Sequence, residues 1–412
     1  MRDADVVIVG AGAAGLSLAH ALAVSSPAAG GPSVLLVDAP PGPLRPPERT
    51  WCFWEEPGGA FDGILAASWQ RLRVRGADGR PVVGAPAPLA YKMLRSDAFE
   101  AHVGAVLAGR DRFGRVAAEV DAVRDGPDGA QVCGRDAAGR PVALRARWVF
   151  DSRPPRALPP ARTTLLQHFR GWFVETADDA FDPGVADLMD FRTPQPAHGL
   201  SFGYVLPTGP RHALVEYTEF SRSPLDAAGY ERALGQYTGE VLGLREFAVT
   251  AAEQGVIPMT DGRFPRRAGR SVFRIGAAGG ATRPSTGYTF AAVQRQSRAV
   301  AARLLAGREP LPPRPHGRRS RAMDAVMLRA LDTGRIDGAG FFAGLFGRVP
   351  FERVLRFLDG GSRPWEDVSI GLRTPVAPML RTVAELPFLP RHPAAPPETI
   401  PQHRAPQGET AS

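Results

Sequence analysis

A glycine-rich turn near the amino terminus constrains the fold of this chain more than any other feature. Residues 5–9 form an apolar run rich in β-branched side chains, and residues 13–24 have the apolar spacing of a helix. Between them stands Gly10-x-Gly12-x-x-Gly15. In this context the first glycine permits a tight turn, the second lets backbone approach a pyrophosphate, and the third allows close helix–strand packing. The sequence therefore predicts an amino-terminal Rossmann βαβ unit of an α/β fold.

An acidic residue follows the next predicted strand and strengthens this interpretation. Residues 34–37 are a second apolar run that ends in Asp38, 23 residues after Gly15. An acid at this place accepts hydrogen bonds from an adenosine ribose, while the positive end of the preceding helix faces the phosphates. The alternative is a plain glycine-rich turn. Strand, helix and trailing acid together favour a dinucleotide-binding site.

A second glycine motif lies far downstream and opens a predicted helix over residues 288–305. It resembles the carboxy-terminal flavin motif of the p-hydroxybenzoate-hydroxylase-like superfamily, and the resemblance implies FAD as the cofactor. We expect Gly276, Gly279 and Gly287 to lie beside it, because backbone N–H groups at a helix start can approach the flavin ring or the pyrophosphate. Many superfamily members carry an aspartate at the position of Ala277, which leaves the ribityl contact unassigned. The two segments of the motif are Arg274-Ile-Gly-Ala-Ala-Gly-Gly280 and Thr286-Gly-Tyr288.

Arg95 is a further candidate for cofactor contact. It precedes a predicted helix over residues 96–107, and relatives in the same superfamily place an arginine near the cofactor at the matching position. The alternative is a solvated arginine at a helix start.

Composition limits the classes of protein to be considered. The chain has 412 residues and is 44% hydrophobic, which is enough for a large core and two or three domains. Its formal net charge of +8 comes almost entirely from arginine, since Lys92 is its single lysine, and we interpret it as compositional bias rather than a nucleic-acid surface. Cys52 and Cys133 form no Cys/His cluster, so we expect neither a disulfide framework nor a structural metal site.

The pattern of elements divides the chain into an FAD-binding domain in two parts, a substrate domain and a helical region. Long alternating segments over residues 164–218 are typical of an antiparallel sheet. No apolar run approaches the roughly 18 residues that span a bilayer, so we expect any membrane contact to be peripheral. The predicted boundaries are residues 1–163 for the first part of the FAD-binding domain, with short inserted strands near residues 71–90; 164–268 for the antiparallel substrate domain; and 269–308 for the second part of the FAD-binding domain. Residues 309–388 are predicted to form a helical region that is a candidate for membrane contact, and residues 389–412 a disordered, proline-rich tail.

Six short tags occur in an order and at a spacing that resemble the lycopene cyclases, up to about residue 385. Each tag alone is weak, and their ordered conjunction is specific. The chain resembles the bacterial lycopene β-cyclases of carotenoid synthesis. The tags are Thr50-Trp-Cys-Phe-Trp-Glu55, Asp187-Leu-Met-Asp-Phe191, Gly199-Leu-Ser-Phe-Gly-Tyr-Val-Leu-Pro207, Leu214-Val-Glu-Tyr-Thr218, Gly255-Val-Ile-Pro258 and Thr286-Gly-Tyr288.

The resemblance implies an acid-catalysed, redox-neutral isomerisation. A proton adds to the terminal double bond of lycopene, a carbocation forms, the chain closes to a β-ionone ring, and a proton leaves. Such chemistry needs a neutral carboxylic acid, and burial in an apolar pocket raises the pKa of a carboxyl group by disfavouring its charged form. The reduced form of FAD is implied to stabilise the cation electrostatically, with NADPH or another donor keeping the flavin reduced.

The acidic motif of the family maps onto Leu-Val-Glu-Tyr-Thr and places the acid at Glu216. On a strand with two-residue alternation, Glu216 shares a face with Leu214 and Thr218, whereas Glu219 points the other way. Many relatives have a second acid next to the first, where this chain has Tyr217. A partner carboxylate is therefore not assumed, and a single acid would both deliver and recover protons. The alternative for Glu216 is an exposed glutamate on an edge strand.

Four more residues are candidates for the substrate pocket. Asp190 and Phe191 belong to one of the six tags, Tyr217 follows the acid, and Tyr288 opens a predicted helix. Asp190 could instead orient polar groups or cap a helix. The implied substrate is lycopene or a related linear carotene.

A carotene resides in the bilayer, which implies a cytoplasmic protein that is peripheral to the inner face of the cell membrane. Residues 303–356 contain eleven arginines and five acidic residues, interleaved with apolar side chains. This mixture predicts either a basic, aromatic surface at an anionic interface or helices packed on the FAD-binding domain with their arginines in water. We expect no nucleic-acid partner, and the sequence does not indicate a protein partner. The apolar residues are Phe341, Phe342, Leu345, Phe346, Val349, Phe351, Leu355 and Phe357.

Two other functions fit parts of the sequence. A flavin monooxygenase or prenyl reductase of the same superfamily would consume NAD(P)H stoichiometrically, whereas a cyclase leaves substrate and product at the same mass. A non-catalytic prenyl-binding escort protein of this fold would lack bound flavin. Pigment mass and flavin content therefore separate the three functions.

Overall fold

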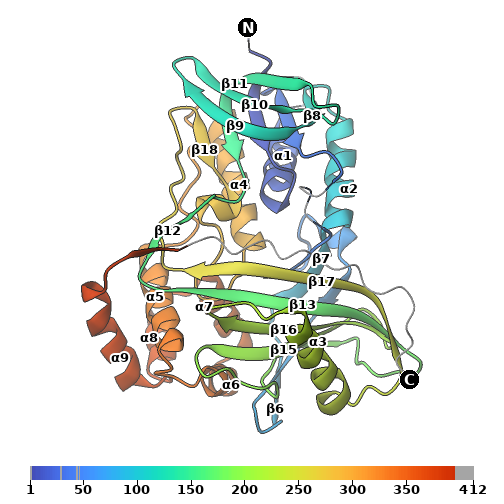
Figure 1. Ribbon diagram of the computed structural model, residues 1–412, viewed down its shortest axis with the longest axis vertical. Helices are drawn as coiled ribbons and strands as arrows, with labels where there is room; N and C mark the ends of the chain where they lie inside the picture. The colour runs from blue at the N-terminus through green and yellow to red at the C-terminus, as the bar shows by residue number, and fades with distance from the viewer. Residues whose placement is uncertain (1, 28–29, 43–44, 46, 395–412) are drawn as a thin grey trace.

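The computed structural model describes residues 2–27, 30–42, 45 and 47–394. Two large β-sheets contain most of its strands, one in the upper and one in the lower half of Figure 1. Helices α1 (Ala13–Ser25), α2 (Ser96–Ala108) and α4 (Phe290–Leu305) belong to the upper half, and the other helices lie around the lower sheet.

The first sheet has the parallel core that the glycine turn predicts. β1 pairs in parallel with β2 and β11, and β11 pairs in parallel with β18, while β9 and β10 extend the sheet in antiparallel fashion. The order is β8-β2-β1-β11-β10-β9, with β18 on β11. The strands are β1 (Ala4–Val9), β2 (Val34–Asp38), β8 (Phe113–Ala117), β9 (Glu119–Gly126), β10 (Gly129–Arg135), β11 (Pro141–Asp151) and β18 (Val272–Arg274).

Helix α1 is buried nearly all round, as its Ala- and Leu-rich sequence indicates. It packs between the sheet and the helices α2 and α4. β1 is likewise buried on both faces, which is typical of a central parallel strand. The glycine turn between β1 and α1 is therefore held by core packing on both sides.

The second sheet has the order β17-β13-β16-β15-β14-β5-β6, and its strands are antiparallel except for the pair β14–β5. β16 lies in its interior, between β13 and β15. The strands are β17 (Phe247–Thr260), β13 (Thr164–Thr176), β16 (His212–Ser221), β15 (Leu200–Pro207), β14 (Val185–Asp190), β5 (Arg71–Arg75) and β6 (Pro81–Gly84).

The strands that we predicted as an insertion in the FAD-binding domain belong to this second sheet. β5 pairs with β14, and β6 pairs with β5. Leu72 and Val74 on β5 are fully buried in the core of the lower half, so these strands extend the sheet rather than the first domain. A segment from the first part of the chain thus completes the substrate sheet.

Two small sheets and four short helical turns complete the connections. β3 (Thr50–Glu55), β7 (Ala90–Arg95) and β4 (Ala67–Trp69) form an antiparallel sheet in the order β3-β7-β4. β12 (Leu158–Ala161) pairs with β19 (His392–Ala394), which lies at the start of the tail for which we predicted disorder. Residues 395–412 lie outside the described residues. The turns are η1 (Asp62–Ile64), η2 (Tyr237–Val241), η3 (Gly276–Gly279) and η4 (Leu386–Phe388).

The remaining helices lie in the lower half, where α3, α5 and α6 pack directly on the second sheet and α9 packs on α5. α3 (Ala227–Gln236) continues into η2 and packs on β13 and β16. The others are α5 (Arg318–Asp332), α6 (Gly338–Arg348), α7 (Phe351–Asp359), α8 (Pro364–Gly371) and α9 (Val376–Glu385). None of the helices in the described part of the chain has both the length and the apolar character needed to cross a membrane.

The basic, aromatic surface predicted for residues 303–356 is wrong. Its apolar side chains are buried or partly buried in the core of the lower half, because α6 packs on β5, β6 and β15 and α7 packs on α6. The packed-helix alternative accounts for the apolar spacing, although the helices pack chiefly on the second sheet.

Candidate active site

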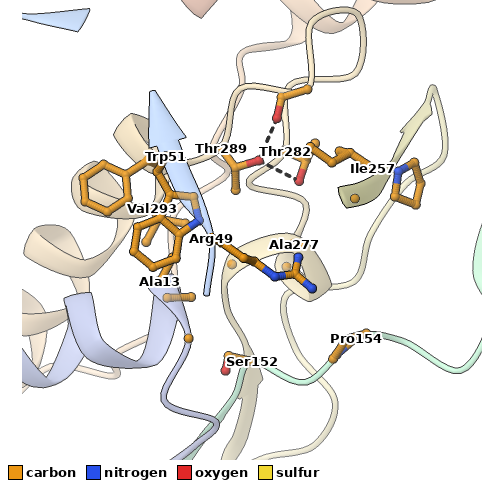
Figure 2. Close-up of a pocket in the computed structure, with 18 of the residues that line it drawn as sticks. Ala13, Arg49, Trp51, Ser152, Pro154, Ile257, Ala277, Thr282, Thr289 and Val293 are labelled. Carbon is orange, nitrogen blue, oxygen red and sulfur yellow. Dashed lines mark hydrogen bonds between the residues drawn. The ribbon is translucent and has the colours of Figure 1, made fainter. Parts of the chain in front are cut away.

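One cavity of about 1550 Å³ connects the glycine turn after β1 with the inner face of the second sheet. Figure 2 shows Ala13 and Trp51 on one side of this space and Ile257 and Pro154 on another, and we call the space the central cavity. Its walls come from the first sheet, the small sheet β3-β7-β4, and strands β13, β15, β16 and β17 of the second sheet. The predicted cofactor and acid positions therefore open into a single space.

The three glycines after β1 have distinct structural roles. Gly10 has a φ of +94°, and a Cβ there would lie 2.5 Å from Ser152 Oγ. A Cβ on Gly15 would lie 1.8 Å from the carbonyl oxygen of Gly10, so helix and strand could not approach as they do. Gly12 is the N-cap of α1, and a Cβ there would meet nothing within 4 Å. The helix start therefore faces open space in the central cavity, as a pyrophosphate site requires.

Asp38 lies at the carboxyl end of β2 and lines the central cavity. Its Oδ1 accepts a hydrogen bond from the backbone N–H of Ala11, 3.2 Å away. This bond joins the acid to the glycine turn. The arrangement brings the two predicted adenosine-site features together.

The second glycine motif forms the opposite wall. Gly276 and Gly279 are the first and last residues of the turn η3. Gly276 has a φ of +63° and lies close to Ala14 of α1, because a Cβ on Gly276 would lie 2.6 Å from the Ala14 Cβ. Gly287 has a φ of +72°, and a Cβ there would lie 1.9 Å from Gln167 Oε1. All three predicted glycines line the cavity, as does Ala277.

Arg95 does not lie among the residues that line the central cavity. Its guanidinium donates hydrogen bonds to Thr50 Oγ1 and Glu48 Oε2, each at 3.0 Å, and lies 4.5 Å from the ring centroid of Phe173. Arg49 lines the cavity instead. Arg95 therefore fixes the side chains of Thr50 and Glu48 and does not itself reach the cavity.

Glu216 opens into the central cavity from β16. Its side chain is buried, and because β16 is an interior strand, the alternative of an exposed edge-strand glutamate is wrong. The pKa of Glu216 is raised to about 8, because burial and, to a lesser extent, the nearby carboxyl of Glu253 outweigh the opposing hydrogen bond from Thr218. That bond runs from Thr218 Oγ1 to Glu216 Oε1 over 2.7 Å. Glu216 is therefore mostly a neutral acid at neutral pH.

Aromatic and aliphatic side chains surround Glu216. Tyr204 and Tyr288 face each other with 3.4 Å between their hydroxyl oxygens. Burial raises the pKa values of Tyr91 and Tyr204 well above the usual phenol value, so these rings stay neutral. The other apolar lining residues on this side include Cys52, Phe169, Leu206 and Leu214. Among the four predicted pocket residues, Tyr288 alone lines the cavity, and Leu214, which was predicted to share a strand face with Glu216, lines it as well.

Asp190 and Phe191 lie away from the central cavity. Asp190 is fully buried, receives a hydrogen bond from Tyr237 Oη at 3.0 Å, and pairs with Arg192 at 2.6 Å. Phe191 is fully buried against Phe202 in the core. The alternative prediction for Asp190, that it orients polar groups, agrees with its contacts to Tyr237 and Arg192.

Tyr217 points to the opposite face of the second sheet, toward α3. Its hydroxyl donates a hydrogen bond to Glu219 Oε2 at 2.8 Å, and Glu219 lies 3.6 Å from His168. Burial opposes ionisation of Glu219, but the bonds from His168 and Tyr217 lower its pKa. Strand alternation thus holds along β16, and an acid at position 217 would point away from the cavity.

A second carboxyl group, Glu253, lines the central cavity and was missed by the sequence analysis. It lies on β17, is buried, and accepts a hydrogen bond from Thr50 Oγ1 at 2.8 Å. Burial raises its pKa, while Thr50, Arg95 and Arg49 oppose the rise. A signal was present, because alternation places Glu253 on the same strand face as Gly255 of the fifth tag.

Solved structures share this architecture across nearly the whole chain. A geranylgeranyl bacteriochlorophyll reductase-like protein from Thermoplasma acidophilum matches with a TM-score of 0.60 and 14% identity, covering 94% of this chain and 100% of that one. The p-nitrophenol 4-monooxygenase PnpA from Pseudomonas putida matches with a TM-score of 0.60 and 16% identity, covering 93% and 98%. The flavin-dependent monooxygenase PieE, solved with FAD and substrate, matches with a TM-score of 0.56 and 17% identity, covering 95% and 73%. The chain therefore has the fold of the flavin-dependent monooxygenases and reductases.

Within this class, the sequence identifies a narrower group. The family model described as "Lycopene cyclase protein" matches residues 5–384, nearly the whole chain. The chain belongs to the lycopene cyclase family, as the six tags predicted. Comparison with curated protein sequences found no match.

Proposed function

We propose that this protein closes the linear ends of lycopene, or of a related linear carotene, to β-ionone rings without net oxidation or reduction. Membership of the lycopene cyclase family supports the substrate class. The observation that carries the proposal is Glu216, a buried neutral acid that opens into an apolar, aromatic cavity. The fold alone is shared with monooxygenases and reductases, so the assignment depends on this acid and on the family.

The chemistry follows from the groups around Glu216. The carboxyl group transfers its proton to the terminal double bond of the substrate, and the ring closes through the resulting carbocation. Leu214 and Phe169 keep water from the cation, while the faces of the tyrosine rings attract positive charge. The last step returns a proton from the new ring to the protein.

The same cavity fits FAD. The open space at Gly12 would hold its pyrophosphate, and Asp38 at the end of β2 would hold its ribose. The turn η3, which lies close to α1, would lie beside its flavin end. When bound in its reduced form, an electron-rich flavin supplies electrostatic stabilisation of positive charge. We propose NADPH or another donor as the reductant that maintains this form.

We also propose that the protein works on the cytoplasmic side of the cell membrane as a peripheral protein. The exposed apolar side chains of α8, α9 and the turn η4 are the surface that we assign to membrane contact, in place of residues 303–356. They are interleaved with exposed arginines, a combination that favours an anionic lipid interface. This α8–α9 surface comprises Trp365, Val368, Leu372, Val376, Leu380, Val383 and Phe388, with Arg363, Arg373 and Arg381.

Pigment analysis in a lycopene-accumulating bacterium tests the proposal. Expression of the chain should convert lycopene to cyclic carotenes of unchanged mass, separated by chromatography and identified by mass spectrometry. Glu216→Gln keeps the shape of the side chain without a transferable proton and should abolish conversion. Glu175→Gln, an exposed position on β13, is the matched control and should cyclise normally. Products that gain oxygen or hydrogen would contradict the proposal and favour the monooxygenase or the reductase.

A further inference from the structure

Two carboxyl groups lie in one row of the second sheet. Gly171 on β13 is paired with Glu216 of β16 on one side and with Glu253 of β17 on the other. Residues directly opposite each other in antiparallel strands point to the same face. Both side chains therefore leave the sheet on the side of the central cavity, and both line it. With neighbouring strands about 4.8 Å apart, the two α-carbons lie roughly 10 Å apart.

The residue between the two acids has no side chain. A Cβ on Gly171 would lie 2.8 Å from Leu214 Cδ1 and 3.4 Å from Glu216 Cβ. Glycine at this position leaves room for the side chains of Leu214 and Glu216, which lie over it and line the central cavity. A substrate end in the cavity above this row would have one carboxyl group on the side of β16 and the other on the side of β17.

The surroundings of the two acids differ. Glu216 has the hydroxyl of Thr218 as its hydrogen-bond donor. Glu253 has the hydroxyl of Thr50 at 2.8 Å and the guanidinium of Arg95 at 3.5 Å, and positive charge from Arg49 also favours its ionised form. Burial raises the pKa of Glu253 too, but these neighbours oppose the rise, so Glu253 is the carboxyl group more available in ionised form to accept a proton, and Glu216 is the one that holds a proton. Two titratable groups in contrasting environments are the usual basis for separate acid and base roles.

We propose that Glu253 is the catalytic base that removes the final proton, an inference that rests on the proposed cyclase function. In the first step the O–H bond of Glu216 breaks, and a C–H bond forms at the terminal double bond of the substrate. After ring closure a C–H bond of the cationic ring breaks, its electron pair becomes the ring double bond, and the proton forms an O–H bond on Glu253. Proton exchange from Glu253 back to Glu216 restores the starting state, so atoms and electrons balance.

The position of the ring double bond tests this role. Glu253→Gln should lower the rate of cyclisation by about 100-fold or more, in the range of general-base removal. Without a placed base the cation loses a proton from other carbons or captures water, so the remaining product should be a mixture of ring isomers and hydrated carotene. A purely structural role for Glu253 would lower the yield without changing the ring isomer. Bound flavin and melting temperature of the variant establish that it is folded.

Two further variants make the result decisive. Glu253→Asp keeps a carboxylate and should make a single ring isomer at a reduced rate. Glu216→Gln should make no cyclic carotene at all. A wild-type protein that makes no cyclic carotene would overturn the cyclase function itself. If the wild type cyclises and Glu253→Gln matches it in rate and in ring isomer, or if Glu253→Asp gives the same mixture as Glu253→Gln, then Glu253 is not the base.

Discussion

At the scale of the residue, the protonation of Glu216 determines whether it can act as an acid. Its pKa of about 8 lies above its ordinary value of 4.5 because burial disfavours the charged form. Between these values the folded chain binds more protons at this site than the unfolded chain does. The stability contributed by this site is therefore greatest below pH 4.5 and is lost as pH rises toward 8.

This linkage predicts that Glu216→Gln stabilises the fold in a pH-dependent way. The difference in free energy of unfolding between variant and wild type should grow with pH across this window to a few kcal/mol, and level off above it. Thermal unfolding from about pH 5 to about pH 9 measures the difference. Glu175→Gln, at an exposed position on β13, is the control for the substitution itself. A stability difference independent of pH would mean that Glu216 titrates normally.

Sequence reasoning located Glu216 but missed its partner. Two-residue alternation along β16 separated Glu216 from Glu219, but Tyr217 was still predicted to line the pocket, although the same alternation points it to the opposite face. No local pattern reveals that β17 lies two strands from β16, and this register is what brings Glu253 to the same row. Asp190 and Phe191 were chosen because they stand in a family tag, and membership of a tag does not determine which way a side chain points.

At the scale of the element, the glycine turn and α1 form the best-predicted part of the fold. The predicted strand and helix match β1 and α1 to within one residue at each end, because strong apolar periodicity and a glycine-rich break act locally. The assignment of β5 and β6 failed because strand pairing between distant segments is not a local property. The burial of α6 and α7 was likewise decided by the sheet beneath them.

Two alanine substitutions in this turn should affect different properties, one the affinity for FAD and the other the stability of the fold. Gly12→Ala places a methyl group in open space, so it should leave the melting temperature unchanged but weaken FAD binding by at least about tenfold, or about 1.4 kcal/mol. Gly15→Ala drives a methyl group against the Gly10 carbonyl and should destabilise the fold by about 1–3 kcal/mol or more. Thermal unfolding and flavin titration separate the two effects. Full flavin affinity in Gly12→Ala would place the pyrophosphate elsewhere.

At the scale of the whole molecule, the α8–α9 surface should bind anionic membranes. A Trp365→Ser, Leu372→Ser and Leu380→Ser triple variant should lose most of its co-sedimentation with vesicles of phosphatidylglycerol and phosphatidylcholine, because its exposed apolar area is removed. Val83→Ser is the control, since Val83 is an exposed apolar residue on β6, away from this surface. Equal vesicle binding by the triple variant and the wild type would contradict the assignment. Raised salt should weaken binding of the wild type by screening the arginines.

In the proposed mechanism a proton delivered by the protein starts ring closure, and the mass of the product formed in heavy water reports this transfer. After the reduced holoenzyme has equilibrated in D₂O, the Glu216 carboxyl carries deuterium, which is transferred to the substrate and kept in the ring. We predict cyclic carotene in which one deuterium has replaced one hydrogen for each ring formed, and no product from Glu216→Gln. Cyclic product without deuterium, or product that has gained oxygen or two hydrogens, would contradict the account.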